Sequence, residues 1–123
     1  MEKKKILIID DEENFTRLVQ LNLEETGRYE VKTVNKGSFG IAAAKEFKPD
    51  LILLDILMPD IEGGEVAFQL KNDKDVKNIP IVFLTAVATK EQVEKSSGFI
   101  GGHPFIAKPV DAEELIECIE KNT

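Results

Sequence analysis

The sequence predicts an α/β fold, a doubly wound three-layer sandwich with a parallel five-stranded sheet. Short apolar runs alternate with segments of helical periodicity along the 123 residues. A run such as residues 51–54 is too short for an ordinary helix and fits a strand buried on both faces. Five strand-then-helix units at this spacing indicate a parallel sheet covered by helices on both faces.

The first unit combines a strand at residues 6–9 with a helix. Glu12 and Glu13 suit the first turn of that helix because they complement its dipole. Gly27 is expected just after its last turn. The predicted inward face of the helix comprises Phe15, Leu18, Val19, Asn22 and Leu23.

The second and third units follow the same pattern. Residues 29–34 alternate and predict a more exposed strand, and the Ala-rich helix at 39–47 is stopped by Pro49. The third strand, at 51–54, ends at Asp55. A loop is predicted at residues 59–64, a helix at 65–71 and a charged loop at 72–78.

The last two units contain the remaining strands. Residues 79–84 predict a strand with Pro80 near its start, followed by a helix at 89–95. Residues 104–107 predict a short fifth strand, and Pro104 suggests an edge position. Asp111 is expected to cap a last helix, with an inward face of Ala112, Leu115, Ile116 and Ile119.

Composition limits the classes of function. Lys and Arg total 16 and Asp and Glu total 23, for a net charge of −7, so binding to nucleic acid or an anionic membrane is not expected. We find no signal peptide and no apolar run of membrane-spanning length. Cys118 is the single cysteine and is interpreted as a packing residue. We expect one cytoplasmic domain covering residues 1–123.

Polar residues stand where the apolar runs end, namely Asp10, Asp11, Asp55, Thr85 and Lys108. Right-handed crossovers bring all these strand ends to one edge of the sheet. Like charges 4 Å apart cost about 4 kcal/mol at an effective dielectric of 20, so a cation is required there. Carboxylate oxygens suit Mg²⁺. An acid cluster, a divalent cation, a lysine and a hydroxyl are the parts needed for phosphoryl transfer, in which a carboxylate can be the nucleophile.

Together these motifs resemble the receiver domain of two-component response regulators, of the chemotaxis-regulator-like kind. The resemblance rests on Asp10-Asp11, on the Asp-Ile-Leu-Met-Pro stretch at 55–59, on Thr85-Ala86 and on Lys108-Pro109, in this order and at strand ends. It covers essentially the whole chain. It implies a flavodoxin-like (βα)5 fold with strand order 2-1-3-4-5.

The resemblance also implies roles for these residues. Asp55 would accept a phosphoryl group from a phosphohistidine of a sensor histidine kinase or phosphotransfer protein. Asp11 would bind Mg²⁺ directly and Asp10 through water, with Asp55 and the backbone carbonyl of Leu57 completing the protein ligands. Lys108 would pair with Asp55 and then with a phosphoryl oxygen.

Further implied roles concern phosphoryl binding and switching. The Thr85 hydroxyl and the Ala86 N–H would bind phosphoryl oxygens. Movement of Thr85 would let Phe105, at the aromatic switch position, follow and change the output surface. Pro109 would shape the loop through a cis bond. Such a protein is a signalling phosphoacceptor that promotes its own phosphorylation and dephosphorylation, not an enzyme acting on a separate substrate.

The partners implied are the kinase or phosphotransfer protein and an unknown output protein or domain, with homodimerisation on phosphorylation left open. Direct nucleic acid or membrane binding by this domain is not expected. Leu57 has no polar side-chain atom to orient water, which predicts a long-lived phosphoryl group. Residues 96–104 depart from the family pattern. For Phe99 and Ile100 in that segment, we consider packing under a shortened helix or a partner patch.

Three alternatives remain open. A degenerate receiver would bind proteins without being phosphorylated. A flavin-binding protein of the same topology would need a Gly/Ser/Thr-rich loop where Asp10–Glu13 stands, and an aspartyl phosphatase commonly has an acid at the position of Leu57. Individually, Thr85 can be a strand-end hydroxyl, Lys108 a solvated charge and Phe105 a core residue. His103 is read as a solvated loop residue.

Overall fold

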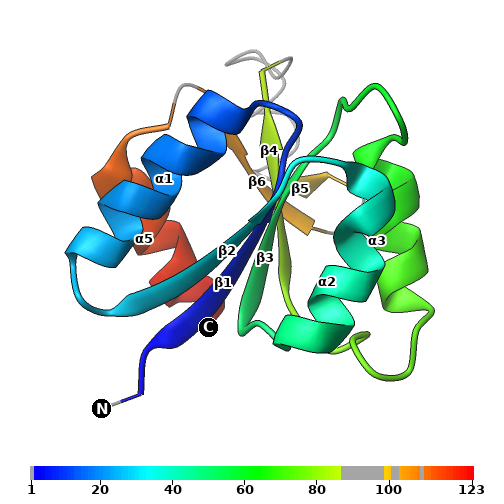
Figure 1. Ribbon diagram of the computed structural model, residues 1–123, viewed down its shortest axis with the longest axis horizontal. Coiled ribbons are helices and arrows are strands. Elements are labelled where there is room, and N and C mark those ends of the chain that lie inside the picture. Colours follow the sequence, from blue (N-terminus) through cyan, green and yellow to red (C-terminus); the bar gives the residue numbers. More distant parts are fainter. Residues whose placement is uncertain (1, 87–98, 101–102, 109) are drawn as a thin grey trace.

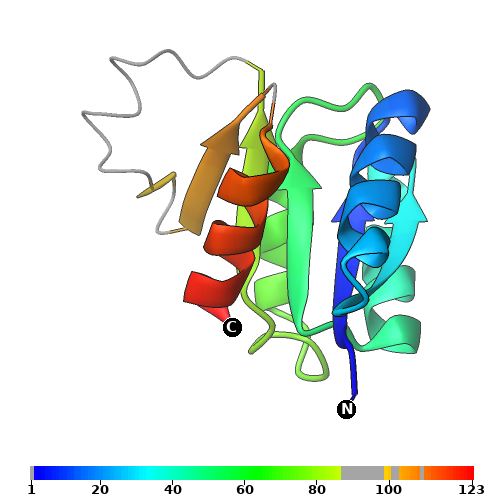
Figure 2. The same ribbon diagram turned by 90° about the vertical axis from the view of Figure 1, so that its left-hand side faces the viewer.

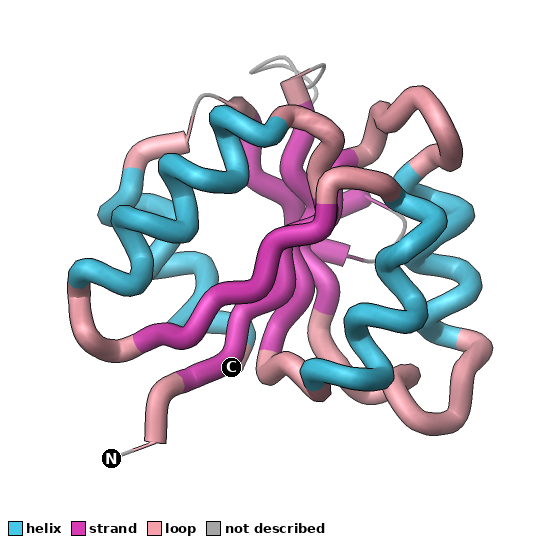
Figure 3. The backbone as a smooth tube through the Cα atoms, in the orientation of Figure 1, coloured by secondary structure: helices cyan, strands magenta, loops and turns pink. Residues whose placement is uncertain are grey.

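A three-layer α/β sandwich forms the protein. The computed structural model describes residues 2–86, 99–100, 103–108 and 110–123. A central sheet separates two helical layers, with α1 and α5 on one face and α2 and α3 on the other (Figure 1, Figure 3). Both chain termini lie toward the edge at which the parallel strands begin.

Five strands run parallel in the order β2-β1-β3-β4-β6, so the predicted order is confirmed, with β6 as the predicted fifth strand. The strand bounds are β1 Lys4–Ile9, β2 Tyr29–Val34, β3 Leu51–Asp55, β4 Ile81–Thr85, β5 Phe99–Ile100 and β6 His103–Ala107.

The edge of the sheet differs from the sequence prediction. The two-residue β5 pairs antiparallel with the start of β6, Phe99 opposite Pro104 and Ile100 opposite His103. The fifth parallel strand is therefore covered at its beginning, although Pro104 suggested an edge position. In the described residues β5 pairs with His103 and Pro104, and the opposite edge of β6 pairs with β4 from Phe105 onward. The predicted helix at 89–95 lies outside the described residues.

The helices are α1 Glu13–Glu25, α2 Gly40–Phe47, α3 Gly63–Lys71 and α5 Ala112–Asn122, with a 3-10 turn η1 at Gly37–Phe39. Gly27 follows α1 with a φ of +77°, the left-handed conformation expected after a helix. Asp111 caps α5 by accepting a hydrogen bond from the Glu113 N–H at 2.8 Å. Helix α3 begins two residues before its predicted start, and the predicted helix at 39–47 divides into η1 and α2.

The inward face of α1 was predicted incorrectly at two positions. Leu18 is 58% exposed and Asn22 is also exposed. The buried stripe consists of Thr16, Val19 and Leu23. Thr16 reaches the interior because its hydroxyl donates to the Glu13 carbonyl at 3.1 Å, which satisfies its polar group.

Two apolar clusters, one on each face of the sheet, stabilise the sandwich. Alternate residues of each strand point to opposite faces, so Leu7 and Ile52 join the cluster under α2 and α3, while Ile6 and Leu51 join the one under α1 and α5. Leu115 and Ile119 of α5 belong to the second cluster, as predicted. Helix α5, in red, lies on the same face of the sheet as α1 (Figure 2). No helix in the described part of the chain has the length and apolar character needed to span a bilayer.

Candidate functional site

Three carboxylates meet where β1 and β3 end. Asp10 and Asp11 directly follow β1, and Asp55 is the last residue of β3. One oxygen from each lies within 4.8 Å of the others. Asp10 and Asp55 are buried, and Asp11 is half-buried. The sequence therefore placed these residues correctly together at one edge of the sheet.

Backbone and side-chain hydrogen bonds fix the position of Asp10. Its N–H donates to the Val34 carbonyl at 3.0 Å, and its carbonyl accepts from the Asn35 amide at 2.8 Å. Its carboxylate Oδ1 accepts from the Glu12 N–H at 3.0 Å. The side chain is thus aimed into the site by the turn between β1 and α1.

Lys108 brings the compensating positive charge from the end of β6. Its Nζ lies 2.6 Å from Asp10 Oδ2, 2.9 Å from Glu12 Oε1 and 3.8 Å from Asp55 Oδ1. The Lys108 side chain is only 9% exposed. The solvated-charge interpretation of this lysine is wrong, since it is largely buried in the acid cluster.

Burial and crowding change the protonation of these groups. Desolvation, followed by repulsion from Asp10, raises the pKa of Asp55 from 3.8 to about 7. Burial also raises the pKa of Asp10, although Lys108 opposes this shift. For Lys108, burial acts to lower the pKa, but hydrogen bonds to Asp10 and Glu12 outweigh it and the pKa is raised. The site therefore favours a bound cation.

Thr85, at the end of β4, is buried beside this cluster of residues. Its carbonyl accepts from the Lys108 N–H at 2.8 Å, so the ends of β4 and β6 are tied together next to the acids. Ala86 follows and is exposed. Leu57 lies in the loop after β3 with its side chain 56% exposed.

Of the two remaining predicted site residues, Phe105 lies among the described residues and Pro109 does not. Phe105 is buried in the cluster under α2 and α3, opposite Phe83 of the neighbouring strand. It is a core residue in this conformation, and its predicted switch movement remains a prediction.

The loop between β3 and α3 is held by two residues that the sequence analysis did not single out. Gly63 donates to the Ile56 carbonyl at 2.7 Å, and a Cβ at this position would overlap the Asp55 carbonyl oxygen. The Asp60 carboxylate accepts from the N–H groups of Gly37 and Ser38, at 3.3 and 2.9 Å. In the sequence, the Gly63-Gly64 pair is the local feature that could have indicated the close approach of Gly63 to Asp55 and Ile56.

His103 and Cys118 lie away from the cluster of acids. His103 is half-buried at the start of β6, with its ring 5.5 Å from that of Phe83 in an edge-to-face arrangement, so the solvated-loop interpretation is wrong. Cys118 packs against the cluster under α1 and α5, as predicted, and burial raises the pKa of its thiol.

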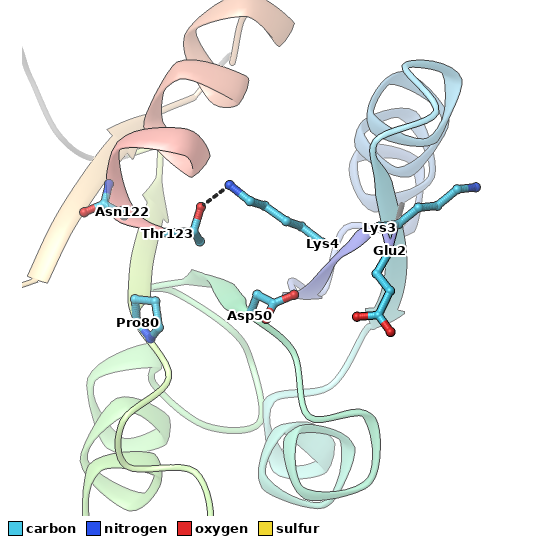
Figure 4. Close-up of a pocket in the computed structure, with 7 residues that line it drawn as sticks. All are labelled: Glu2, Lys3, Lys4, Asp50, Pro80, Asn122 and Thr123. Carbon is cyan, nitrogen blue, oxygen red and sulfur yellow. Dashed lines mark hydrogen bonds between the residues drawn. The ribbon is translucent and has the colours of Figure 1, made fainter.

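A surface pocket occurs at the opposite end of the sheet, where the parallel strands begin (Figure 4). Lys4 and Asp50 line it, together with Thr123 at the chain end, and the Lys4 ammonium donates to the Thr123 hydroxyl at 2.8 Å. The pocket is open, and the group of three acids found among the described residues does not line it. The chemistry-bearing residues are at the other end.

The profile of the response regulator receiver domain matches residues 6–120. The chain belongs to this family of receiver domains. This membership supports a phosphoacceptor role in two-component signalling. It also accounts for an acidic pocket at the carboxyl edge of the sheet, because receiver domains bind Mg²⁺ at such a pocket.

The curated relatives include proteins about twice as long as this chain and one of similar length. This chain is 38% identical, over 91% of its length, to the transcriptional regulator RpaA of Synechocystis. It is 40% identical, also over 91% of its length, to the transcriptional regulatory protein PhoP of Bacillus subtilis. The chain spans 46% and 45% of these two regulators. It is 34% identical to the polar-differentiation response regulator DivK of Brucella anthropi, over 95% of the chain and 94% of DivK.

Solved structures share the fold along almost the full chain. The chemotaxis protein CheY4 of Vibrio cholerae matches with a TM-score of 0.84 and 26% identity, covering 99% of this chain and 100% of CheY4. The N-terminal domain of a receiver protein from Methanoculleus marisnigri matches with a TM-score of 0.70 and 31% identity, covering 95% and 94%.

The donor set of the receiver domain fits Mg²⁺. Three carboxylates can supply the oxygen ligands that this ion prefers. The Oδ2 of Asp10 is buried, and the Lys108 ammonium lies 2.6 Å from it. A buried anionic oxygen of this kind is stabilised by a nearby cation.

Proposed function

We propose that this protein is the phosphoacceptor of a two-component phosphorelay, and that Asp55 takes the phosphoryl group from a phosphohistidine. The donor would be a sensor histidine kinase or a phosphotransfer protein. The observation that supports the proposal is the meeting of Asp55 with the carboxylates of Asp10 and Asp11 and with the Lys108 ammonium at one edge of the sheet.

In the proposed transfer, a carboxylate oxygen of Asp55 attacks phosphorus and forms the O–P bond of an acyl phosphate. The P–N bond of the phosphohistidine breaks, and its electron pair returns to the imidazole nitrogen. Asp55 must be ionised to attack. Lys108 lowers the pKa of Asp55, which still lies at about 7 through burial and repulsion from Asp10, and a bound Mg²⁺ would lower it further.

Mg²⁺, held by Asp10, Asp11, Asp55 and the Leu57 carbonyl, would neutralise phosphoryl oxygens when bound. Lys108 would bind another phosphoryl oxygen, with the Thr85 hydroxyl and the Ala86 N–H completing the phosphoryl site. Phe105, buried on β6 opposite Phe83 of β4, would then follow Thr85 and change the output surface. The output partner would read this surface.

Intact-mass measurement after incubation with acetyl phosphate and Mg²⁺ tests the proposal. We expect a gain of one phosphoryl group, lost in Asp55→Asn and in the presence of EDTA. Asp50→Asn is the matched control, since Asp50 is exposed and directly precedes the same strand, at the end opposite Asp55. Absence of a gain in the folded parent, also with a phosphohistidine donor, would favour the phosphorylation-independent binding module.

A further inference from the structure

The ammonium of Lys108 lies against the first turn of α1. Its Nζ is 2.9 Å from Glu12 Oε1 and 4.4 Å from the centre of the Phe15 ring, a favourable position for a cation over an aromatic face. Asp55 Oδ1 is farther away, at 3.8 Å. The lysine is thus drawn toward α1 and away from the proposed phosphoacceptor.

A lysine ammonium has three N–H donors. Asp10 and Glu12 lie within 3 Å of Nζ and engage two of them. A phosphoryl group on Asp55 presents anionic oxygens that need the same donors. The Glu12 carboxylate therefore competes with that group for Lys108 and adds a like charge near it.

We propose that Glu12 is a positioning residue that, with Phe15, holds the Lys108 ammonium back from Asp55 and so weakens binding of the phosphoryl group. The inference rests on the proposed function. It extends the sequence interpretation of Glu12, which was limited to the helix dipole.

The Glu12 side chain holds Lys108 without also capping helix α1. Glu12 is the N-cap residue of α1, yet its side chain makes no capping hydrogen bond. Its side chain is 60% exposed, so replacing it does not disturb the core. Glu13 follows it in the chain, is also exposed, and has no ion pair with Lys108 in the described structure.

The test measures binding of beryllium trifluoride, a stable mimic of the phosphoryl group, by calorimetry in the presence of Mg²⁺. We compare the parent with Glu12→Gln and Glu13→Gln, which remove the same charge one residue apart. Glu12→Gln should bind the mimic about two- to fivefold more tightly, which corresponds to the upper part of the range for loss of a partly exposed ion pair. Glu13→Gln should change the affinity by less than about twofold, as expected for a more remote exposed charge.

A second readout follows the lysine itself without any phosphoryl mimic. The NMR signal of the Lys108 Cε, assigned by its loss in Lys108→Met, should shift in Glu12→Gln and stay in place in Glu13→Gln. Calorimetry with Mg²⁺ alone should give similar affinities for the two Gln variants, since the acid cluster is intact in both.

The outcomes distinguish the proposed phosphoacceptor function from the positioning role of Glu12. If the parent does not bind the mimic, the proposed function and this inference are both overturned. If the parent binds it but Glu12→Gln binds it no more tightly, the inference alone is wrong. Equal tightening in the two Gln variants would indicate a general charge effect and would also overturn the positioning role of Glu12.

Discussion

At the scale of single residues, Asp55 combines two opposing requirements. It must be ionised to act as a nucleophile, yet it lies buried beside a second buried carboxylate, that of Asp10. Both conditions raise its pKa, to about 7. The reactivity proposed for this residue is therefore linked to the stability of the fold.

Replacing Asp55 should stabilise the metal-free protein in a pH-dependent way. The folded-state pKa of about 7 exceeds the ordinary value of 3.8, so the stability that Asp55 contributes is present below about pH 4 and is lost as the pH rises toward 7. In EDTA at pH 8, Asp55→Asn should unfold with a free energy about 1–3 kcal/mol higher than the parent, and the difference should shrink at pH 5. Urea denaturation measures both values.

The control for this measurement is Asp50→Asn, whose free energy of unfolding should change little, because Asp50 is exposed and an Asn side-chain oxygen can still accept the hydrogen bond from the Lys5 N–H. A benefit of Asp55→Asn that is independent of pH would contradict the assignment of the raised pKa to this residue.

Leu57 leads to a second prediction at this scale. Its side chain is exposed beside the site and contains no polar atom that can orient water. Loss of the phosphoryl group, followed by intact mass after removal of the donor, should be about 3- to 30-fold faster in Leu57→Asn or Leu57→Glu. Equal or faster loss in the parent would show that this side chain does not limit hydrolysis.

At the scale of secondary-structure elements, the loop from β3 to α3 is built on a close approach of two backbones. Gly63 packs against Asp55 and Ile56 so tightly that a Cβ would lie 2.8 Å from the Ile56 Cα. The same loop is tied to η1 through Asp60. The start of α3 thus fixes the backbone next to the proposed phosphoacceptor.

Gly63→Ala should therefore destabilise the fold by about 1–3 kcal/mol and weaken Mg²⁺ binding, because the backbone at Asp55 must shift. Gly64 is the matched control, since a Cβ there meets no atom within 4 Å. Gly64→Ala should leave Mg²⁺ affinity unchanged and stabilise α3 by up to about 1 kcal/mol. Thermal denaturation and calorimetry measure the two effects, and similar results for both variants would rule out the proposed role of the close contact.

At the scale of the whole molecule, the parallel sheet gathers acids of an already acidic chain at one edge. The net charge is −7, and the cluster of Asp10, Asp11 and Asp55 concentrates part of this charge at one end. The two apolar clusters on the faces of the sheet offset the repulsion. A divalent cation should therefore stabilise the whole fold.

Mg²⁺ at ten times its dissociation constant should add about 1.4 kcal/mol to the free energy of unfolding and raise Tm. The gain should be lost with EDTA and reduced in Asp11→Asn. NaCl at matched ionic strength is the control, and an equal rise in Tm with NaCl would indicate screening of the net charge and not binding at the cluster.

Much of the fold and of the candidate site was predictable because its signals are local. Four apolar residues before Asp55 mark a strand buried on both faces, and this strand was found at Leu51–Asp55. The face of α1 was less predictable. The inclusion of Thr16 and the exposure of Leu18 depend on how the helix is rotated against the sheet, and a polar residue inside breaks the apolar periodicity.

The sequence by itself determined the alternation of strands and helices, the edge at which the strand-end residues collect, and the acid, hydroxyl and lysine chemistry present there. These features follow from residue type and spacing along the chain. Only the tertiary structure decided that Lys108 pairs with Glu12 as well as Asp10, that Gly63 abuts Asp55, and that β5 covers the start of β6. The physical reason is distance along the chain: Glu12 and Lys108 are 96 residues apart, and their contact depends on the packing of the elements between them.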